Sequence, residues 1–134
     1  MMTDIIFEYK PLPNSKGKIY PLAKIDLLYE KKKQTFWPII DSGANVSIFP
    51  KAVGDALGID FEGEPEAVEG VLGTFLGYSH FVNIKLGDYS QPVSIRALFL
   101  MGEPYPLLGR EGLFEKFDVM FQERLKKVVF IKKY

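Results

Sequence analysis

Short stretches of alternating apolar and polar residues predict β-strands in several parts of the chain. The alternation runs through residues 23–27, 82–86 and 93–97, and a β-branched and aromatic run follows at 128–131. A period of two places apolar side chains on one face of a sheet and polar side chains on the other. Gly87 and Asp88 separate the second and third segments, so we expect a hairpin between them.

Helical patterns are short and few. The first begins at Pro50, which fits the first turn of a helix, and can end at Gly58. The second follows Gly112 and reaches Phe117, which is enough for one or two turns. Residues 1–18 predict an N-terminal strand and an exposed loop. The pattern as a whole predicts a mainly β, barrel-like protein with one or two short helices, and we expect residues 1–134 to form a single domain.

Composition narrows the chemistry that the chain can support. The 134 residues are 47% apolar, which favours a folded globule, and 17 basic residues balance 17 acidic ones. Because the chain has no net positive charge to attract phosphate groups, we expect no nucleic-acid partner. Cysteine is absent, which excludes disulfides and thiolate metal sites. The single histidine, His80, is predicted to be structural, and we expect neither a metal nor another cofactor.

The chain also carries no sign of a membrane or export segment. No run approaches the ~18 apolar residues that a membrane helix needs. The first residues lack a basic region followed by an apolar stretch, so no signal peptide is predicted. We therefore expect no membrane partner and, by default, a cytoplasmic protein.

One carboxylate lies where a short buried strand is predicted to end. Asp41 follows the run Trp-Pro-Ile-Ile and precedes Ser42 and Gly43. Glycine accepts the backbone angles of a sharp turn, so the carboxylate is predicted to be held rigidly beside the core. A catalytic acid or base is positioned in this way. The alternative is a strand-ending aspartate that only hydrogen-bonds its own turn.

A second segment repeats this pattern downstream. Residues 106–110 read Pro-Leu-Leu-Gly-Arg, so that proline and two aliphatics again precede a small residue. The similarity of 38–40 to 106–108 suggests a faint internal repeat. Between the two segments lies a stretch, 70–77, that carries glycine at three positions: Gly70, Gly73 and Gly77.

The order of these three motifs resembles the retroviral-type aspartic proteases, the retropepsins, and in particular their single-domain cellular and bacterial relatives. The resemblance extends from about Tyr20 to the C-terminus. It implies a retropepsin-like closed β-barrel, the acid protease fold. It also implies aspartic endopeptidase activity on peptide or protein substrates.

The resemblance implies a role for each residue of the first motif. Asp41 corresponds to the catalytic carboxylate. The Ser42 hydroxyl would bond across a dimer axis, and Gly43 would let the turn approach its twin while its N–H points at the carboxylate. Ala44 corresponds to the small residue that the family keeps close to substrate.

The other two motifs have implied roles as well. The hairpin around Gly70, Val71, Leu72 and Gly73 resembles the flap that closes over a peptide. Residues Leu108, Gly109 and Arg110 correspond to the strand under the catalytic turn and the start of the helix after it.

One position departs from the retroviral pattern. The arginine of that pattern pairs with an acid four residues after the catalytic aspartate, whereas this chain has Asn45 there. We therefore expect Arg110 to find another acid.

The implied reaction requires a second chain. Aspartic catalysis needs one ionised and one protonated carboxylate, and the aspartic-protease dyad is the standard example of such a pair. The chain contains one Asp-Ser-Gly, so the second Asp41 must come from a C2 homodimer. We expect a terminal strand such as 128–131 at the interface.

Two alternatives remain beside the enzyme. One is a non-catalytic retropepsin-fold module that binds a peptide as an added strand, and the other is an assembly module. Four acidic residues before the flap are predicted to be a solvated face, although their spacing could favour basic peptides: Glu62, Glu64, Glu66 and Glu69.

Overall fold

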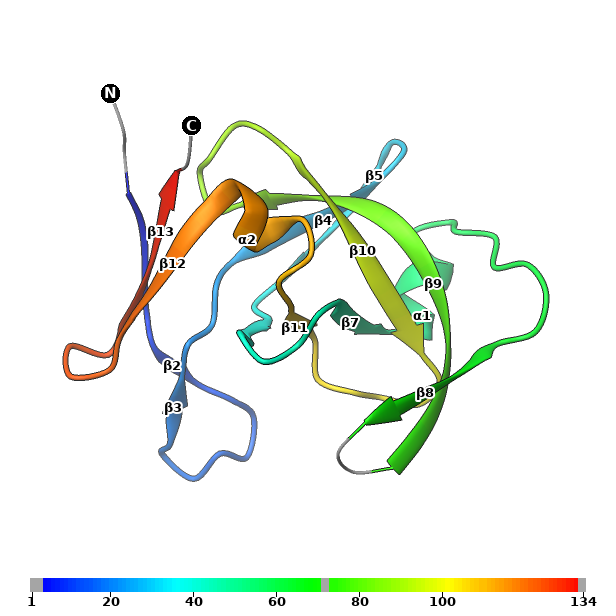
Figure 1. The fold of residues 1–134 in the computed structure, drawn as a ribbon, viewed down its shortest axis with the longest axis horizontal. Helices are drawn as coiled ribbons and strands as arrows, with labels where there is room; N and C mark the ends of the chain where they lie inside the picture. The colour runs from blue at the N-terminus through cyan, green and yellow to red at the C-terminus, as the bar shows by residue number, and fades with distance from the viewer. Residues whose placement is uncertain (1–3, 71–72, 133–134) are drawn as a thin grey trace.

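The computed structural model describes residues 4–70 and 73–132 and confirms a mainly β architecture with two short helices (Figure 1). The strands are β1 (Ile5–Glu8), β2 (Lys10–Pro11), β3 (Ile19–Tyr20), β4 (Ile25–Tyr29), β5 (Lys32–Phe36), β6 (Ile39–Ile40), β7 (Ser47–Pro50), β8 (Glu66–Gly70), β9 (Gly73–Leu86), β10 (Val93–Leu100), β11 (Leu107–Leu108), β12 (Phe117–Gln122) and β13 (Lys127–Lys132). The helices are α1 (Lys51–Ala56) and α2 (Leu113–Lys116).

The largest sheet follows the order β5-β4-β9-β10-β7-β11-β6, with β8 paired to β9. Figure 1 shows this sheet strongly curled as a half-barrel, with the long strands β9 and β10 arching over the short ones. Its two end strands, β5 and β6, are not paired with each other among the described residues. The predicted hairpin at 87–88 joins β9 to β10, and Gly87 has a φ of 53° there.

A second sheet of three strands has the order β1-β13-β12. Both neighbours of β13 are antiparallel to it, with Phe130 opposite Ile5 on one side and Val119 on the other. Phe130 is fully buried, so this sheet closes one end of the core (Figure 1). The small sheet β2-β3 brackets the loop predicted near the N-terminus, with Pro11 already in β2.

Both predicted helices exist and both are short. Pro50 is the N-cap of α1, and Gly58 follows its end with a φ of 84°. The second helix ends earlier than its apolar spacing predicted. Phe117 is fully buried but has extended angles and begins β12, because its side chain is used to pack the sheet and not the helix.

The core is one cluster of apolar side chains enclosed by the curled sheet and the three-stranded sheet. Its aromatic members pack edge to face or stacked, as Phe49 does against Phe36 and Phe99 with ring centroids 5.8 and 6.1 Å apart. Neither helix among the described residues is long and apolar enough to cross a membrane.

Candidate active site

Asp41 directly follows β6 and begins a tight turn. Its backbone N–H donates to the carbonyl of Leu108 at 2.9 Å, and its own carbonyl accepts from the Ala44 N–H at 3.3 Å. The Gly43 N–H donates to Asp41 Oδ1 at 2.9 Å, which is the orientation that the resemblance implies. Asp41 itself is half-buried, while Ser42 and Gly43 are exposed. The carboxylate is therefore oriented by the turn and still open to solvent.

The two similar sequence segments lie side by side. Strands β6 and β11 are parallel, with Ile39 opposite Leu107 and Ile40 opposite Leu108. The residues just before these two strands are also in contact, because the Tyr105 hydroxyl donates to the Trp37 carbonyl at 2.8 Å. Partial burial raises the pKa of that hydroxyl. Asp41 thus leaves the sheet beside Gly109, as the predicted strand under the turn requires.

Gly109 allows the chain to pass under the turn at very short range. A Cβ at this position would lie 2.4 Å from the Val46 carbonyl oxygen and 2.8 Å from that of Ala44. The Gly109 N–H donates at 3.1 Å to the hydroxyl of Ser47, which is completely buried. Sequence reasoning did not identify Ser47, although a serine at an inward position of an apolar strand could have signalled a buried hydrogen bond.

Arg110 lies across the back of the turn. Its Nη1 donates to the Ser42 carbonyl at 2.7 Å, and its Nη2 donates to Asn45 Oδ1. Its backbone N–H also donates to the Ala44 carbonyl at 2.9 Å. The expectation that Arg110 finds another acid is wrong, since it forms no ion pair with a carboxylate in the described part of the chain. The amide of Asn45 accepts the bond that an acid accepts in the retroviral pattern.

The residue after Arg110 connects the turn to the large sheet. The Glu111 N–H donates to the Asn45 carbonyl at 2.8 Å. Its carboxylate forms two hydrogen bonds of 2.9 Å with Nε and Nη2 of Arg96 on β10. These bonds lower the pKa of Glu111 and raise that of Arg96. No sequence signal linked the two residues, because they lie fifteen positions apart in different elements.

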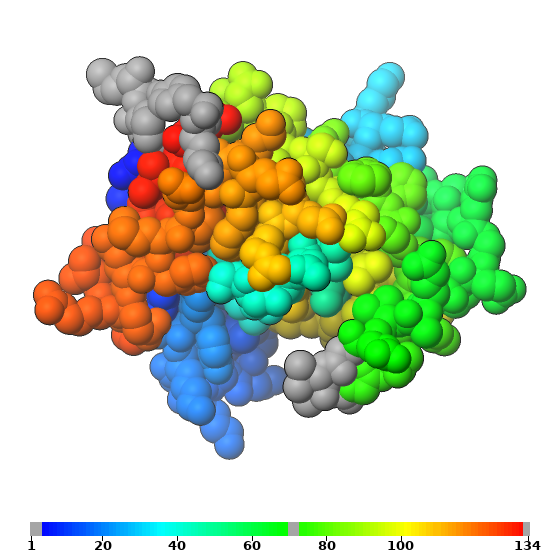
Figure 2. All heavy atoms as spheres, in the orientation of Figure 1, coloured from blue at the N-terminus to red at the C-terminus, as the bar shows by residue number. Residues whose placement is uncertain are grey.

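The turn is accessible on the surface of the molecule. Figure 2 shows the cyan segment that contains it near the middle of the visible face, in contact with the orange segment after β11. The arrangement offers one carboxylate oriented by the Gly43 N–H, in a turn that the Arg110 guanidinium holds through Ser42 and Asn45. The described residues contain no group of three acidic or histidine side chains that could hold a metal ion.

The predicted flap is a hairpin of β8 and the first part of β9. Gly70 is paired with Gly73, and Glu66 with Gly77. Val71 and Leu72 lie outside the described residues. Gly77 is tightly packed, because a Cβ there would lie 2.9 Å from the Phe99 carbonyl oxygen.

Large apolar side chains are exposed along this hairpin and near its base. Phe75 is 41% exposed, Leu76 is 50% exposed and Met101 is 50% exposed. The Met101 N–H donates to the Leu76 carbonyl at 2.9 Å, which brings these two residues into one region.

The terminal strand cannot serve as a free edge for a partner. Residues 128–131 lie in β13, which is hydrogen-bonded to β1 on one side and β12 on the other. Val128, Val129 and Phe130 are also buried in the single chain. That residues 128–131 lie at a dimer interface stays a prediction, and in the described part of the chain the outer strands of this sheet are β1 and β12.

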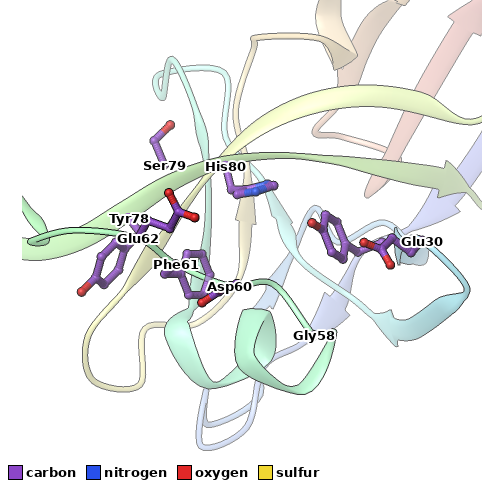
Figure 3. Close-up of a pocket in the computed structure, with 9 residues that line it drawn as sticks. Glu30, Gly58, Asp60, Phe61, Glu62, Tyr78, Ser79 and His80 are labelled. Atoms are coloured by element: carbon purple, nitrogen blue, oxygen red, sulfur yellow. The ribbon is translucent and has the colours of Figure 1, made fainter.

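A separate pocket of about 570 Å³ lies near helix α1 and β9 (Figure 3). Its aromatic wall includes Phe61, stacked on Tyr78 at 5.1 Å and edge-on to His80 at 6.3 Å. The carboxylates of Glu30, Asp60 and Glu62 are spread along it and do not converge on one point (Figure 3). Asp41 does not line this pocket.

No protein-family model and no curated protein sequence matches the chain. Many solved structures are similar to it, among them two proteases. EIAV protease complexed with the inhibitor HBY-793 is 21% identical, with a TM-score of 0.53 over 74% of this chain and 88% of that chain. A retropepsin-like aspartic protease from Rickettsia conorii is 17% identical, with a TM-score of 0.61 over 98% of this chain and 92% of that chain. The chain therefore has the retropepsin fold that its motifs predicted.

Proposed function

We propose that the chain is an aspartic endopeptidase whose catalytic dyad consists of Asp41 from each of two copies. The observation that carries the proposal is the Asp41 turn itself. Its carboxylate accepts the Gly43 N–H, and its backbone is bonded to residues 108–111 at both ends. A turn that served only to end a strand would not require a glycine at a position where a Cβ would lie 2.4 Å from a carbonyl oxygen of the turn. The fold and the order of the motifs support the same reaction.

The proposed mechanism follows from two carboxylates that share one proton. The ionised Asp41 takes a proton from a water molecule, whose oxygen attacks the carbonyl carbon of the scissile peptide bond. The protonated Asp41 of the other copy donates its proton to the carbonyl oxygen, which gives a neutral tetrahedral diol. The Asp41 that took the water proton then gives it to the amide nitrogen while the other, now ionised, takes a proton from a diol hydroxyl, so that the C–N bond breaks to give a carboxylic acid and an amine. Two close carboxylates cannot both ionise, which keeps the shared proton in place.

The β8–β9 hairpin supports peptide substrates. The exposed side chains of Leu76 and Met101, which lie opposite each other, offer apolar contact area for a bound segment, and Phe75 is exposed on the other face of the hairpin. The β8–β9 hairpin presents backbone groups next to them. An extended peptide can use such groups as an added strand.

The test is cleavage of a peptide library between about pH 3 and pH 8 by the wild type and by Asp41→Asn, which keeps the shape of the side chain and removes its ionisable group. We expect cleavage by the wild type on the acid side and a loss of several orders of magnitude in the variant. Equal activity in both proteins would reject Asp41 as the catalytic group. Peptide binding without cleavage by the wild type would favour the non-catalytic binding module.

A further inference from the structure

The bond between Arg96 and Glu111 joins the large sheet to the segment behind the Asp41 turn. Nε and Nη2 of Arg96 meet the two oxygens of Glu111, each at 2.9 Å. A guanidinium that engages both oxygens fixes the plane and position of the carboxylate, which a single-point contact does not. Arg96 itself is held in β10, where it lies opposite Phe81 of β9.

The backbone on the other side of this bond holds the turn. The Glu111 N–H donates to the Asn45 carbonyl, and the neighbouring Arg110 bonds the carbonyls of Ala44 and Ser42. A displacement of residues 110–111 would therefore move the second half of the turn that carries Asp41.

The chain next to Glu111 is also held tightly against the sheet. Gly112 has a φ of 85°, and a Cβ on it would lie 2.3 Å from the Ser94 carbonyl oxygen. Residues 111 and 112 thus contact β10 by a side chain and by backbone packing, two positions apart along that strand. Of these two contacts, only the Arg96–Glu111 ion pair can be altered without a steric clash, because any side chain on Gly112 would overlap the Ser94 carbonyl.

We propose that Arg96 is a positioning residue for Asp41, acting through Glu111 to fix the segment that holds the catalytic turn. The proposal rests on the proposed function and specifies how this chain aligns that site. The two side chains are 40% and 42% exposed, so the pair adds little to overall stability. Its effect is expected in geometry, because a misplacement of about 1 Å at a reacting group can lower a rate about a hundredfold.

The test is a charge exchange. We compare Arg96→Glu, Glu111→Arg and the double variant that carries both, in which the pair is restored with reversed polarity. The matched control exchanges Lys51 and Asp55, an exposed ion pair of 3.0 Å on α1 that lies outside the turn. For each protein we measure kcat, KM, the melting temperature and amide hydrogen exchange of residues 41–45.

Each single variant should lower kcat by about tenfold to a hundredfold with KM little changed, and should speed exchange at Gly43 and Ala44. The double variant should recover most of the wild-type kcat and most of the wild-type protection from exchange. The control exchange of Lys51 and Asp55 should change neither kcat nor hydrogen exchange. The proposal is overturned if the single variants match the control, or if the double variant is no better than either single. Amide hydrogen exchange reports on the order of the turn even if the wild type cleaves no peptide. A wild type without cleavage therefore contradicts the proposed function, whereas unchanged exchange in the single variants contradicts the positioning role of Arg96.

Discussion

Arg110 donates from Nη2 to the side-chain oxygen of Asn45, and this neutral acceptor stands where the retroviral pattern has an acid. The same guanidinium donates to the Ser42 carbonyl at 2.7 Å. Arg110 therefore spans the Asp41 turn without an ion pair to any described carboxylate. Because an amide does not titrate, this contact persists as the solution becomes acidic, in the range where the proposed dyad would work.

Asn45→Asp tests whether a negative charge at position 45 strengthens the contact with Arg110. We expect the variant to be more stable than the wild type at pH 7 by about 0.2–1 kcal/mol, the usual range for an exposed ion pair. The arginine would lower the pKa of the new carboxyl, so the gain is present above the ordinary aspartate value of about 3.9 and is lost as the pH falls through the lowered one. Urea unfolding at pH 7 and pH 3 measures the difference. Asn45→Ala is the control, and it should be less stable than the wild type at both pH values.

Glu111 makes stability depend on pH. Its hydrogen bonds to Arg96 lower its pKa from the ordinary value of 4.5, and Glu66 also acts on the same arginine. A lowered pKa in the folded state means that the contribution is fully present above 4.5 and is lost as the pH falls through the lowered value. The melting temperature of the wild type should exceed that of Glu111→Gln at pH 6 and approach it at low pH. A difference that does not change with pH would contradict this assignment.

Gly109→Ala tests the close approach beneath the turn. The added Cβ would lie 2.4 Å from the Val46 carbonyl oxygen, a backbone atom that cannot move aside without displacing the turn. We expect a loss of about 1–3 kcal/mol in the free energy of unfolding. Gly63→Ala is the control, because its Cβ would meet nothing within 4 Å and only its φ of 77° opposes the change. A smaller loss in Gly109→Ala than in the control would show that the packing is looser than described.

The sequence predicted the parts of the site that depend on local patterns. Alternating residues located the long strands, and the motif around Asp41 located the turn, because strand periodicity and glycine preferences act over a few residues. The similarity of 38–40 to 106–108 suggested a repeat, and in the structure Ile40 and Leu108 of these segments are partners in parallel strands. These predictions concern neighbours along the chain or repeated motifs.

The features that the sequence did not predict depend on contacts made by folding. Arg110 was expected to pair with an acid because charge is visible in a sequence, whereas the distance to an amide is not. The two neighbours of residues 128–131 in their sheet, β1 and β12, come from opposite ends of the chain and were not predicted. The pairing of Arg96 with Glu111 also arises only when β10 and the segment after β11 meet. Single-sequence patterns carry no record of such partners.

The last prediction concerns the shared site. If each catalytic unit needs one Asp41 from each of two chains, a dimer of wild type with Asp41→Asn has only one catalytic carboxylate and is inactive. Wild type and variant are unfolded together in denaturant, mixed and refolded, so that chains pair at random. The activity per wild-type chain should fall to about one half with an equal amount of variant and to about one tenth with a ninefold excess.

Adding the same excess of wild type in place of the variant is the control, and it should raise the total activity. Sedimentation of each mixture at micromolar concentration should show the dimer, since neither variant nor wild type lacks the surfaces that join the copies. Activity that depends only on the amount of wild type, whatever the amount of Asp41→Asn, would mean that one chain contains the whole catalytic group. The two-chain dyad would then be wrong, even if Asp41 itself proved essential.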